Sequence, residues 1–477
     1  MKDLIKKISY QDLLFAFLSI SLFMVFLMPF THYTSLNLID ISSGGKTQYS
    51  NDLLTANISL FKDRYYIFYY TLCMSSIAIV LNFKLLKNLI GYFFSFSKTT
   101  QIAVCLFFVF GIISSVFAIS PSIAFKGVSV TFLQFINVMF VAWYVQHKED
   151  AVKNFYMVVM LSLVFFGGAL ALQLMLSNLS VYGAVIAGNI QKILLYMYNC
   201  LNPRFLDNYF SWFMPLLLLA WFVDLRPIYK VGSFIALTVV WFVLINHAFR
   251  TIFAEYFVIL PLLLFFSRRY FKITVFILVT TFVCAYLVDL GFKEYLLAHV
   301  QSGIASSEDL MRMGDSGRSL VWAEAFRVGL EHPFTGIGQW NYLAVTKRPD
   351  GYPHNLLLEI WSQWGIPAFI CATVVIVTCM KNLFTRAKEL CANPYHCIFM
   401  MMLVAGMVDG MLNAMFKTSL GLFGCVFVFG LCLSMFKPQI DDNETVSVLS
   451  NIVVITTVLA CLFCIVILPL IYPPMWM

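Results

Sequence analysis

Long apolar runs with almost no charged residues recur along the whole of this 477-residue sequence. An α-helix needs about 20 apolar residues to cross the hydrocarbon core of a bilayer, and by that measure the sequence holds about thirteen such runs. Each spanning segment must satisfy its own backbone N–H and C=O groups, so the runs are expected to be helical. The sequence therefore predicts an all-α polytopic membrane protein with about 12–13 transmembrane helices.

The expected helices end where polar or charged residues interrupt the apolar runs. They cover approximately residues 11–30, 65–83, 102–119, 129–146, 155–175, 210–224, 231–248, 252–267, 273–290, 356–380, 398–414, 418–436 and 449–471. The two helices around Arg250 are joined by very few residues, which predicts a hairpin there. The longest polar segment falls between the ninth and tenth helices. We therefore divide the chain into N-terminal helices (1–290), one large loop (291–355) and C-terminal helices (356–477).

Composition excludes several other classes of protein. Hydrophobic residues make up 61% of the chain and charged residues only 12%, whereas soluble domains average about 45–50% and 25%. Most of the 12 cysteines lie inside apolar runs, where thiols behave as small hydrophobic side chains. No cysteine and histidine spacing indicates a metal site, and no glycine-rich phosphate loop supports nucleotide-driven transport. We therefore expect neither a metal nor a cofactor.

The distribution of basic residues predicts the orientation of the helices. The net charge is +7, and Lys and Arg concentrate in the short loops on the same side as the N-terminus. Short cytoplasmic loops carry such an excess in membrane proteins. The N-terminus is therefore expected in the cytoplasm and the large loop in the periplasm, with the protein in the bacterial inner membrane.

The large loop carries the most informative residues. Its three motifs are Ser316-Gly317-Arg318-Ser319-Leu320-Val321-Trp322, Glu331-His332-Pro333-Phe334-Thr335-Gly336-Ile337-Gly338 and Tyr352-Pro353-His354-Asn355. Residues 323–330 fit a short amphipathic helix that ends before Pro333, and Gly336 and Gly338 permit a tight turn. Pro353 restricts the backbone and would place His354 at the start of the next helix.

This order of motifs resembles the O-antigen ligase-related superfamily, whose large periplasmic loop carries the same sequence of Arg, His-Pro-x-x-Gly-x-Gly and His-Asn. The resemblance implies a donor glycan on undecaprenyl diphosphate and an acceptor hydroxyl in the periplasm. Two further stretches are similar to arginine positions of the family, namely Arg204 in Asn-Pro-Arg-Phe and Arg250 in His-Ala-Phe-Arg. Relatives often have Glu where this chain has Gln363, and Glu359 stands one helical turn earlier.

The chemistry of these residue types suits that reaction. Arginine binds phosphate oxygens through a planar, two-pronged fork, so we assign Arg204, Arg250 and Arg318 to the diphosphate. A neutral histidine accepts a proton near neutral pH, so His354 is the candidate base, with Arg318 as its catalytic partner. The supporting residues are Asn355, Gly336, Gly338 and the intramembrane carboxylate Asp409. Lys417 is a candidate partner for Asp409 across the outer end of the helices.

The resemblance implies a metal-independent, inverting glycosyltransferase, and we expect an O-antigen ligase that acts on lipid A–core. An O-antigen polymerase, which extends another glycan, remains an alternative. So does a protein O-oligosaccharyltransferase, which modifies Ser or Thr of a pilin-like protein. A flippase for lipid-linked glycans is the non-enzyme alternative, although it has no evident need for a long outer loop that ends in histidine.

Overall fold

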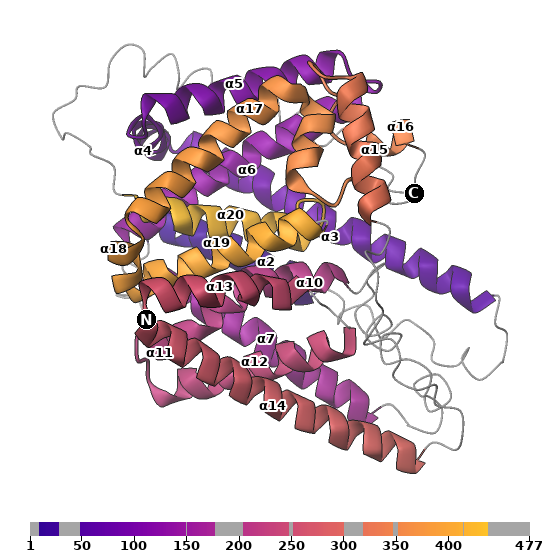
Figure 1. Cartoon of the computed structure of the whole chain (residues 1–477), viewed down its shortest axis with the longest axis vertical. Helices are drawn as coiled ribbons and strands as arrows, with labels where there is room; N and C mark the ends of the chain where they lie inside the picture. Colours follow the sequence, from indigo (N-terminus) through magenta and orange to yellow (C-terminus); the bar gives the residue numbers. More distant parts are fainter. Residues whose placement is uncertain are drawn as a thin grey trace.

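The computed structural model describes residues 9–27, 48–148, 150–176, 204–247, 251–299, 318–346, 352–413 and 415–436. Every regular element in these ranges is a helix (Figure 1). Nine of the described helices are long and apolar enough to cross a membrane. They are α2 (Tyr10–Leu27), α3 (Gln48–Leu81), α5 (Lys98–Val116), α6 (Pro121–His147), α7 (Ala151–Leu176), α12 (Pro227–His247), α14 (Arg268–His299), α17 (Leu356–Thr385) and α19 (Pro394–Leu412). The predicted all-α polytopic fold is confirmed.

Shorter helices complete the described part of the chain. Two of them, α13 (Thr251–Phe266) and α20 (Ser419–Ser434), are apolar. The others are α4 (Phe83–Phe94), α10 (Arg204–Phe213), the 3₁₀ helix η3 (Pro215–Leu218), α11 (Leu219–Phe222), α15 (Arg318–Glu331), α16 (Tyr342–Thr346) and α18 (Ala387–Ala392). The amphipathic helix expected at residues 323–330 is confirmed as α15, which begins five residues earlier at Arg318.

Helix α20 lies inside the bundle, packed against α6, α10 and α19. Trp212 of α10 lies against Gly406 of α19 and Gly424 of α20, where any larger residue would collide with its indole ring. The indole Nε1 donates to the carbonyl of Gly421 at 2.9 Å. Small residues let helices approach closely in membranes, where packing drives their association. These contacts hold α10, α19 and α20 together around the site described below.

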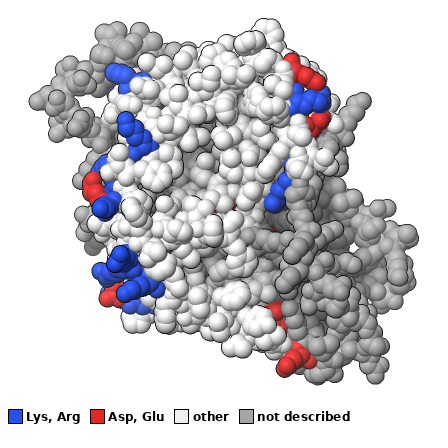
Figure 2. Space-filling model, in the orientation of Figure 1, with Lys and Arg blue, Asp and Glu red and all other residues white. Residues whose placement is uncertain are grey.

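The outer surface of the bundle is apolar over a broad zone. Large hydrophobic side chains are exposed on several helices, including Phe257, at 80%, and Phe265, at 75%, on α13. Figure 2 shows Lys and Arg gathered along the edge that carries α11 and α18, and further charged residues of both signs at the opposite edge. A lipid-facing zone between two charged edges is the arrangement expected of a protein that crosses a bilayer.

The helices differ from the expected boundaries in several places. The segment expected as one helix at residues 210–224 is α10, η3 and α11, broken near Pro215 because proline lacks the N–H that helix continuation requires. The two helices expected as a hairpin around Arg250 pack mainly on different partners, α12 on α14 and α7 and α13 on α19. They contact each other through the rings of Trp241 and Phe253, 6.2 Å apart, and the residues that join them lie outside the described ranges. Helix α4 was not expected, and α14 continues past residue 290 to His299. The helix expected at 449–471 lies outside the described residues.

Candidate functional site

The C-terminal end of α19 is the place where the candidate residues meet. Asn413, which follows α19, accepts a hydrogen bond from Arg318 Nη2 at 2.7 Å. The amide nitrogen of Asn413 donates to Thr251 Oγ1 at 3.0 Å and also to Asp409 Oδ1. One asparagine thus connects the first residues of α13 and α15 to the last turn of α19.

Asp409 is completely buried and is held by amide groups. Asn208 of α10 donates to Asp409 Oδ2 at 2.8 Å and accepts from Thr418 Oγ1 at 2.9 Å. A carboxylate in an apolar interior is costly unless hydrogen bonds replace its hydration. The two asparagines supply these bonds, so Asp409 fixes α10 against the end of α19.

Two further acidic residues lie beside this network. Ser211 donates to Glu255 Oε1 at 2.7 Å, and both Glu255 and Asp207 are fully buried. They lie on α10 and α13, and both of these helices pack on α19, which carries Asp409. Sequence reasoning did not select Asp207 or Glu255 as site residues, although acidic residues in apolar helices are a signal of function or pairing.

His354 lies in an unusual backbone conformation immediately before α17. Its φ is +54°, in the left-handed region that residues other than glycine seldom adopt. Its ring makes an edge contact with the ring of Tyr352, at 4.5 Å between centroids. Two neighbours hold this backbone in place. Tyr352 contacts the ring of His354, and the next residue, Asn355, is fixed by hydrogen bonds to two helices.

Asn355 caps α17 and attaches it to α19. Its Oδ1 accepts from the backbone N–H groups of Leu357 and Leu358, both at 3.1 Å. Its Nδ2 donates to the carbonyl of Met411 at 3.2 Å. Asparagine is a favoured helix N-cap for the first of these reasons. The second bond places His354 and Arg318 around the same end of α19.

Two predicted arginines are less fully described. Arg204 is the first residue of α10, one turn before Asn208, but its side chain is not among those described. Arg250 lies outside the described residues and directly precedes Thr251, which contacts Asn413. Both arginines are therefore close in the chain to residues of the network. The role of their side chains remains a prediction from the sequence.

A second cluster surrounds a largely buried ion pair that joins α17 to the connection between α19 and α20. Lys417 Nζ contacts Glu359 Oε1 at 2.9 Å, with side chains only 4% and 17% exposed. The suggested pairing of Lys417 with Asp409 is therefore wrong, since the amides of Asn208 and Asn413 surround Asp409 instead. Lys417 and Asn413 stand at opposite ends of the same connection between α19 and α20, so this connection contacts both clusters.

Gly336 and Gly338 lie against a break in α17 and not in the cluster around Arg318. Gly365 interrupts the helix with φ +82°, and Pro367 follows it. A broken helix leaves carbonyls without their usual partners. Here the N–H groups of Ile337 and Gly338 donate to the carbonyls of Ser362 and Gln363, at 3.1 and 2.9 Å.

The fit at this break is too close for side chains. A Cβ on Gly336, whose φ is +62°, would overlap the backbone of Gln363, and one on Gly365 would overlap the backbone of Phe334. Ser114 of α5 adds a hydrogen bond to the carbonyl of Gln363 at 2.7 Å. The segment from Gly336 to Gly338 thus packs its backbone against the break in α17 and satisfies the carbonyls there.

The arrangement offers a cation, a histidine and several amides around one helix end. Arginine can hold a phosphate group, and histidine beside it can exchange a proton with a hydroxyl. Within the described ranges, no three His, Cys, Asp or Glu side chains form a group that could hold a metal ion. Three of the residues predicted from the sequence, Arg318, Asn355 and Asp409, therefore lie together at the end of α19. His354 directly precedes Asn355 in the chain.

Comparison with protein-family models places part of the chain in a known family. Residues 234–373 match the family model described as O-antigen ligase. The matched segment includes Arg250, Arg318 and His354, whereas Arg204 and Asp409 lie outside it. A comparison with curated proteins finds no match.

Proposed function

We propose that this chain moves a glycan from undecaprenyl diphosphate to an acceptor hydroxyl at the periplasmic face. The match of residues 234–373 to the O-antigen ligase family model supports its place in the O-antigen ligase-related superfamily. The acceptor we favour is lipid A–core, which would make the protein an O-antigen ligase of the bacterial inner membrane. The observation that carries this proposal is the meeting of Arg318 and the His354–Asn355 pair around the end of α19.

In the proposed reaction, His354 takes the proton from the acceptor hydroxyl. The hydroxyl oxygen attacks the anomeric carbon of the donor sugar, and the bond from that carbon to the diphosphate oxygen breaks. A single displacement of this kind inverts the anomeric configuration. The leaving diphosphate carries the electron pair of the broken bond, so its negative charge grows as the reaction proceeds.

Arginines stabilise that growing charge. Fixed cationic donors placed where charge develops are commonly a large part of enzymatic rate enhancement. Arg318 is oriented by Asn413, and Arg204 and Arg250 are its proposed partners on the diphosphate. The activated donor supplies the driving force, so the proposed step requires no nucleotide.

Purified protein in nanodiscs, supplied with an undecaprenyl diphosphate-linked glycan and lipid A–core, tests this proposal. The expected product is a lipid A–core molecule enlarged by the glycan, together with free undecaprenyl diphosphate, both measured by mass spectrometry. Elongation of the donor glycan would instead indicate a polymerase. Transfer to a pilin-like protein would indicate an oligosaccharyltransferase.

The same preparation separates an enzyme from a flippase. A flippase would move the labelled donor between leaflets of a vesicle and leave its glycan attached. Donor movement without any cleaved diphosphate would contradict the proposed function.

A further inference from the structure

The side chain of Asn413 makes hydrogen bonds in two opposite senses. Its Oδ1 accepts from Arg318 Nη2 at 2.7 Å. Its Nδ2 donates to Asp409 Oδ1 and to Thr251 Oγ1, the second at 3.0 Å. A guanidinium only donates hydrogen bonds, and a carboxylate only accepts them. The amide is therefore fixed with its oxygen toward Arg318 and its nitrogen toward Asp409.

The residue that holds Arg318 in this way is neutral. A carboxylate in the same place could take the guanidinium in a two-pronged ion pair, which is the geometry that phosphate oxygens also use. An amide offers a single acceptor oxygen and no negative charge. Asn413 therefore orients the guanidinium of Arg318 without itself offsetting its positive charge.

The amide also stands between two charged groups. Asp409 lies one helical turn before Asn413 on α19 and is fully buried, and Asn208 donates to its other carboxylate oxygen at 2.8 Å. Arg318 is the first residue of α15 and is partly exposed. The carboxylate and the guanidinium are thus joined through Asn413, each at the end of the amide that suits its charge.

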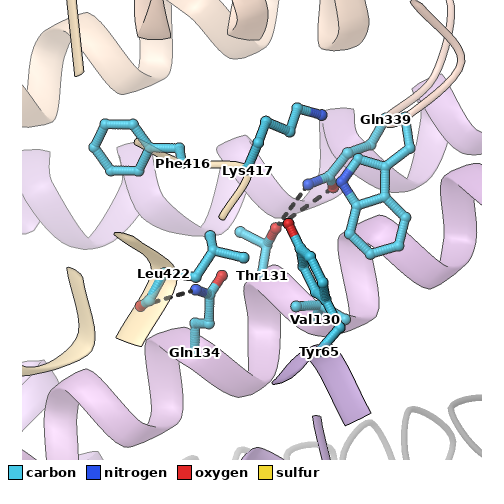
Figure 3. Close-up of a pocket in the computed structure, with 9 residues that line it drawn as sticks. Tyr65, Val130, Thr131, Gln134, Gln339, Phe416, Lys417 and Leu422 are labelled. Atoms are coloured by element: carbon cyan, nitrogen blue, oxygen red, sulfur yellow. Dashed lines mark hydrogen bonds between the residues drawn. The ribbon is translucent and has the colours of Figure 1, made fainter. Parts of the chain in front are cut away.

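The backbone around Asn413 is held firmly. Its N–H donates to the last turn of α19 at 2.7 Å. Farther along the connection to α20, Lys417 pairs with Glu359 of α17, and Thr418 caps α20. Figure 3 shows Phe416 and Lys417 beside a small pocket of about 20 Å³, which has room for about one water molecule. Close packing of this kind keeps a positioning side chain in one place.

We propose that Asn413 is a positioning residue for diphosphate recognition. It holds the guanidinium of Arg318 at the end of α19 in a fixed orientation and keeps a competing carboxylate away from it. The inference rests on the proposed function, in which Arg318 binds the diphosphate of the donor. It implies that an amide is required at position 413, because an aspartate of the same size would compete with the diphosphate for Arg318.

Binding of farnesyl diphosphate, a short and soluble polyprenyl diphosphate, tests the proposal without turnover. The purified full-length protein is placed in nanodiscs, and binding is measured by isothermal titration calorimetry. Asn413→Asp hardly changes the shape of the side chain but puts a carboxylate against Arg318. Hydrogen bonds to charged groups are among the strong ones, so this variant should raise the Kd for farnesyl diphosphate about 10-fold or more.

Asn393→Asp is the matched control, because it makes the same chemical change at the opposite end of α19. Asn393 caps the start of that helix and accepts from the backbone N–H groups of Tyr395 and His396. Asparagine and aspartate are about equally good in this role. The control should therefore bind farnesyl diphosphate with the Kd of the wild type.

A double variant keeps the test decisive if Asn413→Asp unfolds through repulsion from Asp409. In Asn413→Asp/Asp409→Asn, the new amide at position 409 can donate to the carboxylate at position 413 and accept from Asn208. The buried contacts are thus restored, while a carboxylate still faces Arg318. Binding should stay about 10-fold weaker than in the wild type. Wild-type affinity in either variant, once folded, would overturn the proposal.

Kinetics separate positioning from a purely structural role. In the transfer assay, Asn413→Asp should raise the KM for the donor and leave the KM for the acceptor nearly unchanged. A loss of kcat with an unchanged donor KM would remove this inference and keep the proposed function. Weakened farnesyl diphosphate binding by Asn413→Asp, in a protein without transferase activity, would leave this inference standing and remove the proposed function.

Discussion

At the scale of single residues, His354 combines a candidate base with a backbone conformation that few residues tolerate. A positioned base contributes about 10²–10⁴-fold to a rate, so His354→Asn should lose about that much glycan transfer. Asparagine adopts positive φ more readily than most residues, so this variant should keep the melting temperature of the wild type. Turnover and thermal unfolding of the purified variants check both outcomes.

His332→Asn is the control for that experiment. His332 is exposed at the end of α15 and should tolerate the change with unaltered transfer. Wild-type turnover in His354→Asn would exclude His354 as the base and leave the arginines as the catalytic hypothesis.

Arg318 offers a test of phosphate recognition. Lysine keeps its positive charge but lacks the fork that matches phosphate oxygens and Asn413. Hydrogen bonds to charged groups contribute about 1.5–3 kcal/mol, so Arg318→Lys should reduce kcat/KM by roughly 10- to 100-fold. The measurement is the rate of transfer at limiting donor concentration.

Arg327→Lys, on the same helix, is the matched control. Arg327 is about half exposed and pairs with Glu324 and Glu331, whose hydrogen bonds raise the pKa of its guanidinium. Exposed pairs of this kind contribute little to stability, and transfer should be unchanged. Equal rates for both lysine variants would show that the fork of Arg318 has no role.

At the scale of secondary structure, the break in α17 depends on Gly365. Alanine there would require an unfavourable positive φ and would overlap the backbone of Phe334. Strain of this kind costs about 1–3 kcal/mol, so Gly365→Ala should lower the melting temperature in detergent. Gly91→Ala in α4 meets nothing within 4 Å and should be neutral or slightly stabilising. An unchanged melting temperature for Gly365→Ala would show that the break can be straightened.

The ion pair of Lys417 and Glu359 predicts a strong coupling between the two residues. Removing one partner of a buried pair typically costs about 3–5 kcal/mol, so Lys417→Met should destabilise the protein by roughly that amount. Lys417→Met/Glu359→Gln should recover much of the loss, as measured by thermal or denaturant unfolding. The more exposed pair of Lys148 and Asp12 is the control, and Lys148→Met should cost less than about 1 kcal/mol. Additive losses in the double variant would contradict a coupled pair.

Apolar runs predicted the helices well because spanning segments are recognised by length and composition alone. Breaks and contacts were harder to predict. The Gly365-Ile366-Pro367 run was visible in the sequence, but its partner segment is about thirty residues earlier in the chain. Periodicity likewise could not show that Asn208, Asn413 and Thr251 converge, because each lies on a different element.

At the scale of the whole molecule, the two charged edges predict the orientation in the membrane. Phe334→Cys, at a residue 75% exposed beside α15, should react with an impermeant maleimide in intact spheroplasts on a cysteine-free background. Lys388→Cys on α18 should react only after the membrane is opened. The reverse pattern would place the site in the cytoplasm and exclude the proposed use of a periplasmic acceptor.

The covered break in α17 also governs how the protein is assembled. When α17 leaves the insertion machinery, the carbonyls of Ser362 and Gln363 lack partners until the residues from Pro333 to Gly338 fold back over them beside α5. An unsatisfied backbone group in lipid costs several kcal/mol, so we expect α17 to dock only after α5 and the translocated loop are in place. Substitutions between Pro333 and Gly338 would then leave α17 undocked for longer and expose it to membrane proteases. Their effect would be measured as a lower cellular abundance of the protein, while the molecules that complete assembly turn over at the normal rate.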